Sequence, residues 1–236
     1  MGIAENAAAV RERIGAAARR AGRNADDVVL MGVSKTFPAE AVREAYAAGI
    51  RVFGENRVQE FAEKSSNLPT GLDGLRDAEW HLIGHLQSNK AGKAAELFDA
   101  VDSVDSLRLA ERLNAAAATF GKKLRVLIEI NIGGEEAKVG LHPSAPELEE
   151  ILLAAPRLDH LEVRGLMTIP PFRENPEDAR PYFRKLREVR DGIAARQLSG
   201  VGMSVLSMGM SHDFEIAVEE GSTCVRVGTA IFGTRA

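Results

Sequence analysis

Cysteine is nearly missing from this chain, which has one, Cys224, among 236 residues. A single cysteine forms no internal disulfide, and because Cys224 lies in an apolar run we expect it to be a buried strand residue in a reducing compartment. Five histidines are present, but no pair has metal-ligand spacing with a third ligand nearby. We therefore predict a cytoplasmic protein without a metal site.

Long hydrophobic runs and a strong charge imbalance are also lacking. No run reaches the roughly 18 apolar residues of a membrane span. Glu5 and Glu12 interrupt the alanines of residues 1–23, which predicts a first helix rather than a signal peptide. The net charge is −4 and the 30 lysines and arginines are dispersed, so nothing indicates binding to nucleic acid or to a membrane. Small molecules and proteins are the expected partners.

The glycine motif G-x-G-x-x-G does not follow the first expected strand, which weakens an open doubly wound sheet as the competing fold. Short apolar runs recur instead, each followed by a segment of helical periodicity. The expected strands are Val28–Val33, Arg51–Phe53, Trp80–Ile83, Ala100–Val104, Leu124–Ile130, Leu161–Met167, Ser204–Met208 and Thr223–Val227. Eight such units, joined by right-handed crossovers, close into a barrel. We predict a single (β/α)₈ TIM barrel domain over residues 1–236, with an extra N-terminal helix.

The last two expected strands both end in small residues. Residues 204–211 read SVLSMGMS and residues 224–229 read CVRVGT, with a helical segment between them. Glycine lets an anion approach backbone N–H groups, hydroxyls add donors, and a helix N-terminus adds partial positive charge. Either motif alone is more simply a turn. The pair predicts a phosphate site, because barrels commonly hold phosphate after strands 7 and 8.

Lys35 directly follows the first expected strand. At the mouth of a barrel, desolvation favours the neutral amine, which can attack a carbonyl. A surface lysine at the start of a loop is the simpler alternative. Together with a phosphate site in the same mouth, Lys35 indicates a Schiff base with an aldehyde that carries a phosphate.

Six motifs occur in order between Val29 and Gly233. They are residues 33–35 (VSK), 53–60 (FGENRVQE), 80–90 (WHLIGHLQSNK), 165–168 (GLMT), 206–213 (LSMGMSHD) and 225–233 (VRVGTAIFG). This set resembles the pyridoxal phosphate homeostasis protein family, the single-domain relatives of the N-terminal barrel of alanine racemase. The resemblance implies a protein that binds pyridoxal 5′-phosphate (PLP) reversibly and acts in its intracellular homeostasis as a carrier or buffer of the cofactor.

The resemblance also implies roles for individual residues. Lys35 forms the internal aldimine with PLP, and Arg226 faces the pyridine nitrogen. Asn56 and His81 flank the ring, although His81 is equally consistent with a core histidine bonded to a backbone carbonyl. The residues expected to hold the phosphate are Ser207, Gly209, Ser211, Gly228 and Thr229.

Strong catalysis is not expected from these residues. An arginine is always charged and only donates to an unprotonated pyridine nitrogen, so Arg226 weakens carbanion stabilisation, unless it instead pairs with a carboxylate on a neighbouring helix. Racemisation needs acid/base groups on both faces of the aldimine, but Tyr46 and Tyr182 fall on outer helices, and the C-terminal domain that supplies the second base in alanine racemase is not expected here. We therefore predict no catalytic residue, with a PLP-dependent racemase or related fold type III enzyme as the alternative.

Two further alternatives concern the Schiff base. Lys138 follows the fifth expected strand, and a solvated lysine in an acidic loop is a simpler interpretation than a second aldimine site. A sugar-phosphate aldolase would use the same lysine and phosphate site, and only the full motif set argues against it. For the carrier, we expect apo forms of PLP-dependent enzymes as further partners and a monomer or weak dimer.

Overall fold

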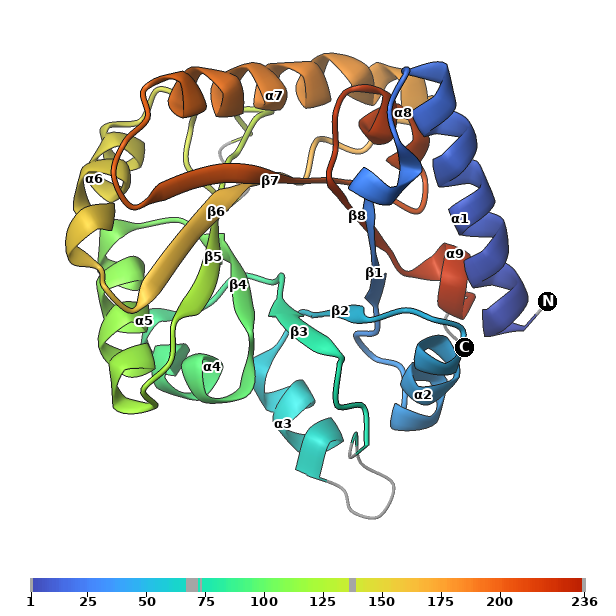
Figure 1. The fold of residues 1–236 in the computed structure, drawn as a ribbon, viewed down its shortest axis with the longest axis horizontal. Coiled ribbons are helices and arrows are strands. Elements are labelled where there is room, and N and C mark those ends of the chain that lie inside the picture. Colours follow the sequence, from blue (N-terminus) through green and yellow to red (C-terminus); the bar gives the residue numbers. More distant parts are fainter. Residues whose placement is uncertain (1, 67–71, 73, 136–138, 235–236) are drawn as a thin grey trace.

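Eight parallel strands close a barrel in the part of the chain that the computed structural model describes, residues 2–66, 72, 74–135 and 139–234 (Figure 1). Each strand pairs with the next in the sequence, and the last returns to pair with the first. The strands are β1 (Val29–Val33), β2 (Val52–Glu55), β3 (Glu79–Leu82), β4 (Ala100–Val104), β5 (Leu124–Glu129), β6 (Leu161–Met167), β7 (Val201–Met210) and β8 (Cys224–Val227). A closed parallel barrel gathers the carboxyl ends of its strands at one face.

A helix follows every strand and packs on the outside of the barrel (Figure 1). These helices are α2 (Ala39–Ala47), α3 (Val58–Ser66), α4 (Ala91–Leu97), α5 (Leu107–Thr119), α6 (Pro146–Ala154), α7 (Arg180–Ala195), α8 (Phe214–Glu219) and α9 (Thr229–Phe232). Short 3₁₀ helices are η1 (Ala25–Asp27), η2 (Ser88–Lys90), η3 (Ala155–Arg157) and η4 (Pro176–Ala179). An additional helix, α1 (Ile3–Arg20), precedes β1, so the predicted barrel with an extra N-terminal helix is confirmed.

Two strands are longer than their apolar runs predicted. β2 continues beyond Phe53 to include Glu55, whose carboxylate is fully buried beside Lys64. β7 extends beyond the expected residues 204–208 at both ends, and its register against β8 shifts between Ser207 and Met210. Apolar patterning places a strand end at the first polar residue, so in β2 it stops before the buried Glu55.

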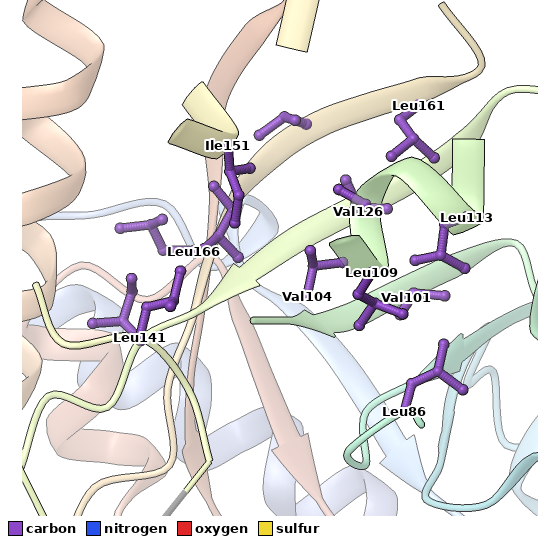
Figure 2. Close-up of a cluster of buried hydrophobic side chains, with 14 of the residues drawn as sticks. Leu86, Val101, Val104, Leu109, Leu113, Val126, Leu141, Ile151, Leu161 and Leu166 are labelled. Atoms are coloured by element: carbon purple, nitrogen blue, oxygen red, sulfur yellow. The ribbon is translucent and has the colours of Figure 1, made fainter. Parts of the chain in front are cut away.

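The hydrophobic core fills the layer between the barrel and its helices. Figure 2 shows Leu109 and Leu113 of α5 and Ile151 of α6 beside Val101 and Val126 of the strands. All five side chains are at most 2% exposed. Burial of each side chain of this size contributes about 1.5–3 kcal/mol, so the strand ends that carry the mouth rest on a rigid support.

The first helix covers the region where the barrel closes. α1 lies beside α8 and α9 (Figure 1), and its buried stripe includes Val10 and Ile14. This stripe packs into one cluster with Phe214 and Val218 of α8 and Val225 of β8. The spacing of its buried residues is that of an amphipathic helix, in agreement with the helix that the sequence predicted from Glu5 and Glu12 among the alanines.

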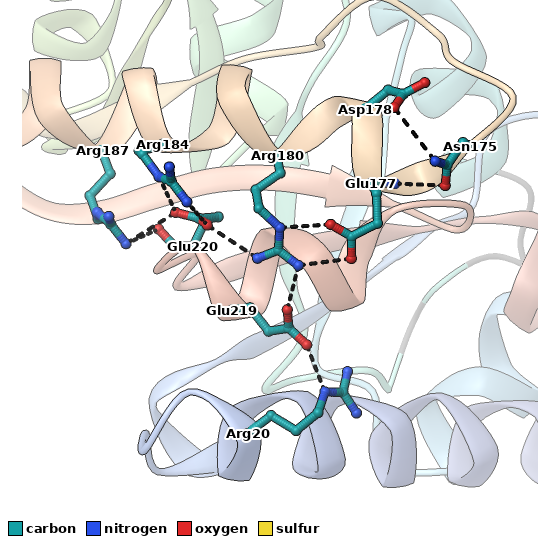
Figure 3. A network of polar contacts seen from close by, with 9 residues as sticks. All are labelled: Arg20, Asn175, Glu177, Asp178, Arg180, Arg184, Arg187, Glu219 and Glu220. Carbon is teal, nitrogen blue, oxygen red and sulfur yellow. Dashed lines mark hydrogen bonds and ion pairs between the residues drawn. The ribbon is translucent and has the colours of Figure 1, made fainter.

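A polar network joins α1, α7 and α8 at the surface (Figure 3). Arg180 lies 2.7 Å from a carboxylate oxygen of Glu219 and 3.1 Å from one of Glu220. Arg20 of α1 reaches Glu219 at 2.7 Å, and Arg184 reaches Glu220 at 3.0 Å. Burial opposes ionisation of Glu220, but hydrogen bonds from Arg184 and Arg180 lower its pKa overall. The network therefore fixes the end of α8, the helix that connects β7 to β8.

Candidate functional site

A cavity of about 380 Å³ opens among the carboxyl ends of the strands. It is lined by Lys35 after β1, Asn56 after β2, Glu129 at the end of β5 and Arg226 on β8. Further lining residues include His85, Ser211, His212, Gly228 and Thr229. The volume suits a small ligand, and this face is where barrels place their functional groups. Another cavity, of about 480 Å³, lies beside α1 at the starts of β1 and β2, away from every predicted site residue.

The loop that carries Lys35 is held by a buried ion pair beneath it. Glu55 is fully buried and the Lys64 side chain is 8% exposed. Lys64 Nζ donates to Glu55 Oε1 at 2.6 Å and to the Ser34 carbonyl at 2.9 Å, and Ser34 Oγ donates to the same carboxylate oxygen at 2.8 Å. Burial raises the pKa of Glu55, although Lys64 and Ser34 act in the opposite direction. The backbone just before Lys35 is thus fixed by the contacts of Ser34 with Lys64 and Glu55.

The residue after Lys35 is held as well. Thr36 has φ of +66°, in the left-handed region that side chains other than glycine rarely adopt, and its N–H donates to Glu60 Oε1. Phe37 then stacks on Phe232 of α9 with ring centroids 5.0 Å apart. These contacts hold the half-buried Lys35 on the cavity wall.

Arg226 is a buried cation at the base of the cavity, and it is 3% exposed. Its Nη1 donates to Ser207 Oγ at 2.8 Å, and its Nη2 donates to the Thr168 carbonyl at 2.7 Å. Burial lowers the pKa of Arg226, which the charges of Asp102 and Glu129 oppose. A guanidinium remains protonated in proteins, so Arg226 is a fixed positive donor held from two sides.

Ser207 therefore lies where the phosphate prediction did not place it. Its side chain is fully buried, it does not line the mouth cavity, and its hydroxyl accepts the hydrogen bond from Arg226. Alternate residues of a strand face opposite sides, and Ser207 lies inside β7 rather than after it. In the structure, Ser207 orients the Arg226 guanidinium through this hydrogen bond.

Gly209 also serves the fold rather than the cavity lining. Its φ is +94°, and a Cβ there would lie 2.5 Å from the Cβ of Ala217. Glycine is therefore required for α8 to pack against the end of β7. Beyond it, Asp213 Oδ1 accepts a hydrogen bond from the Met210 N–H at 2.7 Å and closes the turn.

Three of the predicted phosphate residues do meet at the cavity. Ser211, Gly228 and Thr229 line it together, from the ends of β7 and β8. Ser211 Oγ accepts hydrogen bonds from the N–H groups of Gly228 at 3.2 Å and of Ala230 at 3.3 Å. A hydroxyl and backbone amides thus converge at one edge of the mouth, as an anion site requires.

His81 lies within β3, as in the expected strand, but it does not line the mouth cavity. Its Nδ1 is 3.1 Å from Asp102 Oδ1, and it lines a smaller cavity of about 90 Å³ with Asp102 and Cys224. Burial alone would lower the pKa of His81, but Asp102, with help from Glu79, raises it to about 9. The neighbouring Cys224 is buried, as predicted, and burial raises the pKa of its thiol to about 12. His81 is thus a core histidine paired with an aspartate.

Glu129, His85 and His212 line the cavity, and none of them was in the predicted set. Glu129 is 3% exposed, and His85 Nδ1 lies 3.2 Å from Asp105 Oδ2. A carboxylate at the end of an apolar run, Leu124 to Ile130, is the sequence signal that could have revealed Glu129. Lys138 lies outside the described residues.

The described residues contain no group of three histidine, cysteine, aspartate or glutamate side chains arranged to hold a metal ion. No helix among them is both long enough and apolar enough for a membrane crossing.

The fold and the site together define a barrel of the alanine racemase type, with a lysine after β1 and an arginine on β8. The family model described as alanine racemase, N-terminal domain, matches residues 6–236. More narrowly, the chain belongs to the pyridoxal phosphate homeostasis protein family. It is 47% identical to the member from Aquifex aeolicus over 235 residues, covering 100% of this chain and 99% of that protein. The member from Escherichia coli K12 is 45% identical over 237 residues, covering 99% of this chain and 97% of that protein.

Solved structures agree with this assignment. PipY of Synechococcus elongatus, in a structure described as having PLP bound, is 39% identical with a TM-score of 0.80, covering 98% of this chain and 100% of that chain. Alanine racemase from Streptomyces coelicolor is 23% identical with a TM-score of 0.68, covering 97% of this chain and 59% of that chain. The similarity to alanine racemase supports the fold alone.

Proposed function

We propose that this protein binds PLP in the mouth of its barrel and acts in PLP homeostasis as a reversible carrier of the cofactor, without robust catalysis. One observation carries the proposal. A single cavity of about 380 Å³ is lined by Lys35, by Arg226 and, at one edge, by Ser211, Gly228 and Thr229. Membership of the pyridoxal phosphate homeostasis protein family supports the same function.

The residues of the cavity fit the chemical groups of PLP. Ser211 and Thr229 offer hydroxyl donors for a phosphate, beside Gly228, whose N–H donates to Ser211 Oγ. Arg226 offers a charged donor for the pyridine nitrogen. Lys35 Nζ is the nucleophile for the aldehyde carbon. When bound, the cofactor supplies that aldehyde and an electron-withdrawing ring.

Each contact is stabilised by a neighbour that does not touch the ligand. Ser207 Oγ and the Thr168 carbonyl orient Arg226, so its charge is fixed before the ligand arrives. Lys64 and Glu55 anchor the backbone before Lys35. Because a guanidinium donates its proton without releasing it, the pyridine nitrogen stays unprotonated, which weakens the ring as an electron sink. The site thus favours binding of the cofactor over reactions at the Cα atom of an amino acid.

An amino-acid racemase is the alternative function. Neither tyrosine lines the cavity, since Tyr46 donates to Asp77 and Tyr182 accepts from Arg173 at 3.0 Å. The acid/base groups that do line it beside Lys35 include Glu129 and His85. Exchange of the α-hydrogen of amino acids in deuterated water tests this alternative directly.

The carrier is further proposed to work in the cytoplasm, as a monomer or weak dimer, and to deliver PLP to apo forms of PLP-dependent enzymes. The experiment incubates the PLP-loaded protein with such an apo-enzyme and a reagent that traps free PLP. Transfer faster than dissociation into the trap supports delivery. Transfer no faster than dissociation would mean that the protein only buffers PLP. Absence of a borohydride-sensitive absorbance band at ~420 nm would exclude the Schiff base. Lys35→Ala should lose this band, and Lys93→Ala, at an exposed lysine of α4, should keep it.

A further inference from the structure

Glu129 and Lys35 lie on opposite walls of the same mouth. The barrel is closed in the order β1 to β8, so β5 is four strands from β1 in either direction. Glu129 is the last residue of β5, Lys35 follows β1, and both line the mouth cavity. A group at Glu129 therefore meets whatever ligand spans the cavity from Lys35.

The carboxyl group of Glu129 is built into this wall. It is 3% exposed, and its Oε2 is buried without a hydrogen-bond partner among the described residues. The chain after β5 returns over it, since the Leu141 N–H donates to the Glu129 carbonyl at 2.8 Å. Gly140, with φ of +100°, passes so close that a Cβ there would lie 3.1 Å from Glu129 Cγ. Solvent is kept away from this side, and the buried oxygen has no partner among the described residues of the wall.

The surroundings do not stabilise a negative charge at Glu129. Among the described residues it forms no ion pair, and the two hydrogen bonds of Arg226 go to Ser207 and Thr168 instead. Asp105, paired with His85 at 3.2 Å, adds a like charge nearby. Burial first and Asp105 second raise the pKa of Glu129 to about 7, although Arg226 acts in the opposite direction. The other ionisable groups that line the cavity are Lys35, His85 and His212.

We propose that Glu129 contacts bound PLP as a neutral carboxylic acid, so that its ionisation weakens the hold on the cofactor. The inference rests on the proposed function. PLP is an anion at neutral pH, and a protonated carboxyl donates a hydrogen bond to an anionic oxygen, whereas a carboxylate repels it in a buried site. Loss of one proton from Glu129 then favours release, which also requires hydrolysis of the Lys35 Schiff base by water, and no change of fold is needed.

The test compares wild type with Glu129→Gln, which keeps a neutral donor of the same size at every pH. Equilibrium dialysis of each protein against PLP from pH 5.5 to 8.5 gives two dissociation constants at every pH. Their ratio cancels the pH dependence that PLP and Lys35 contribute to both. If only the neutral acid binds, the ratio of wild type to variant is close to 1 at pH 5.5 and rises to about 30-fold at pH 8.5. A ratio that is flat across this range overturns the proposal.

Infrared spectroscopy of the PLP-loaded wild type reads the proton itself. A carbonyl band of a protonated carboxyl at pH 7 that is lost in Glu129→Gln supports the proposal, and the same band lost in Glu177→Gln, at an exposed residue, overturns it. Failure of the proposed function is distinct. If the proposed function is wrong, the wild type binds no PLP at any pH. If only the proposal for Glu129 is wrong, the wild type binds PLP, but the ratio of dissociation constants does not depend on pH.

Discussion

Replacing Lys64 with methionine should destabilise the fold and should do so most strongly at alkaline pH. The change leaves Glu55 fully buried without its cation and removes the hydrogen bond to the Ser34 carbonyl. Breaking a buried ion pair costs about 3–5 kcal/mol. Glu55 can limit this cost by taking up a proton, and raising a carboxyl pKa from 4.5 past pH 7 requires about 3 kcal/mol. We therefore expect a loss of about 3 kcal/mol at pH 7.

The direction in which the stability of the variant changes with pH follows from the pKa of Glu55. In the variant the folded pKa of Glu55 lies further above its unfolded value, so stability falls as the pH rises from about 4.5 to the folded pKa. Urea unfolding at pH 5 and pH 8 measures this difference. Glu55→Gln combined with Lys64→Met should recover most of the loss, because no charge stays buried. Lys93→Met, at an exposed pair with Glu96, should change stability by less than about 1 kcal/mol. A Lys64→Met protein as stable as Lys93→Met at pH 8 refutes the reasoning.

Four other changes separate the roles of the residues that line the mouth and of Ser207, which supports one of them. Thr229→Ala should weaken binding of PLP by about 1–3 kcal/mol but not binding of pyridoxal, whereas Ser207→Ala should weaken both in titrations, because it acts through Arg226. Arg226→Glu should speed exchange of the α-hydrogen of amino acids in deuterated water, read by mass spectrometry, because a carboxylate favours a protonated pyridine nitrogen. Glu129→Gln should stabilise the PLP-free protein against urea by up to about 3 kcal/mol at pH 8 and by little at pH 4.5, since the folded pKa is raised to about 7.

The order of the strands was predictable because each apolar run is followed by a helical segment. β4 (Ala100–Val104) and β6 (Leu161–Met167) have the predicted bounds. The pattern says nothing about polar residues that fold inward, so Glu55 was placed outside β2 and the pairing of His81 with Asp102 was not predicted. Burial of a charged group depends on its partner, here Lys64 or Asp102, and the partner comes from a distant part of the sequence.

The candidate site was partly predictable for the same reason. Lys35, Asn56 and Arg226 line the mouth as expected from their place near strand ends. Ser207 does not, because strand alternation turns it inward onto Arg226. Glu129 was missed because the burial of its carboxyl group and the lack of a partner for Oε2 among the described residues are seen only in the structure.

The central claim is that Lys35 bonds the cofactor in this mouth, and mass mapping tests it most directly. The PLP-loaded protein is reduced with borohydride, digested, and searched for peptides that carry the pyridoxyl phosphate mass. The account predicts one dominant modified residue, Lys35, with the modification lost in Lys35→Ala and retained in Lys93→Ala. Modification mainly at another lysine, such as Lys138, or no modified peptide at all, would contradict it.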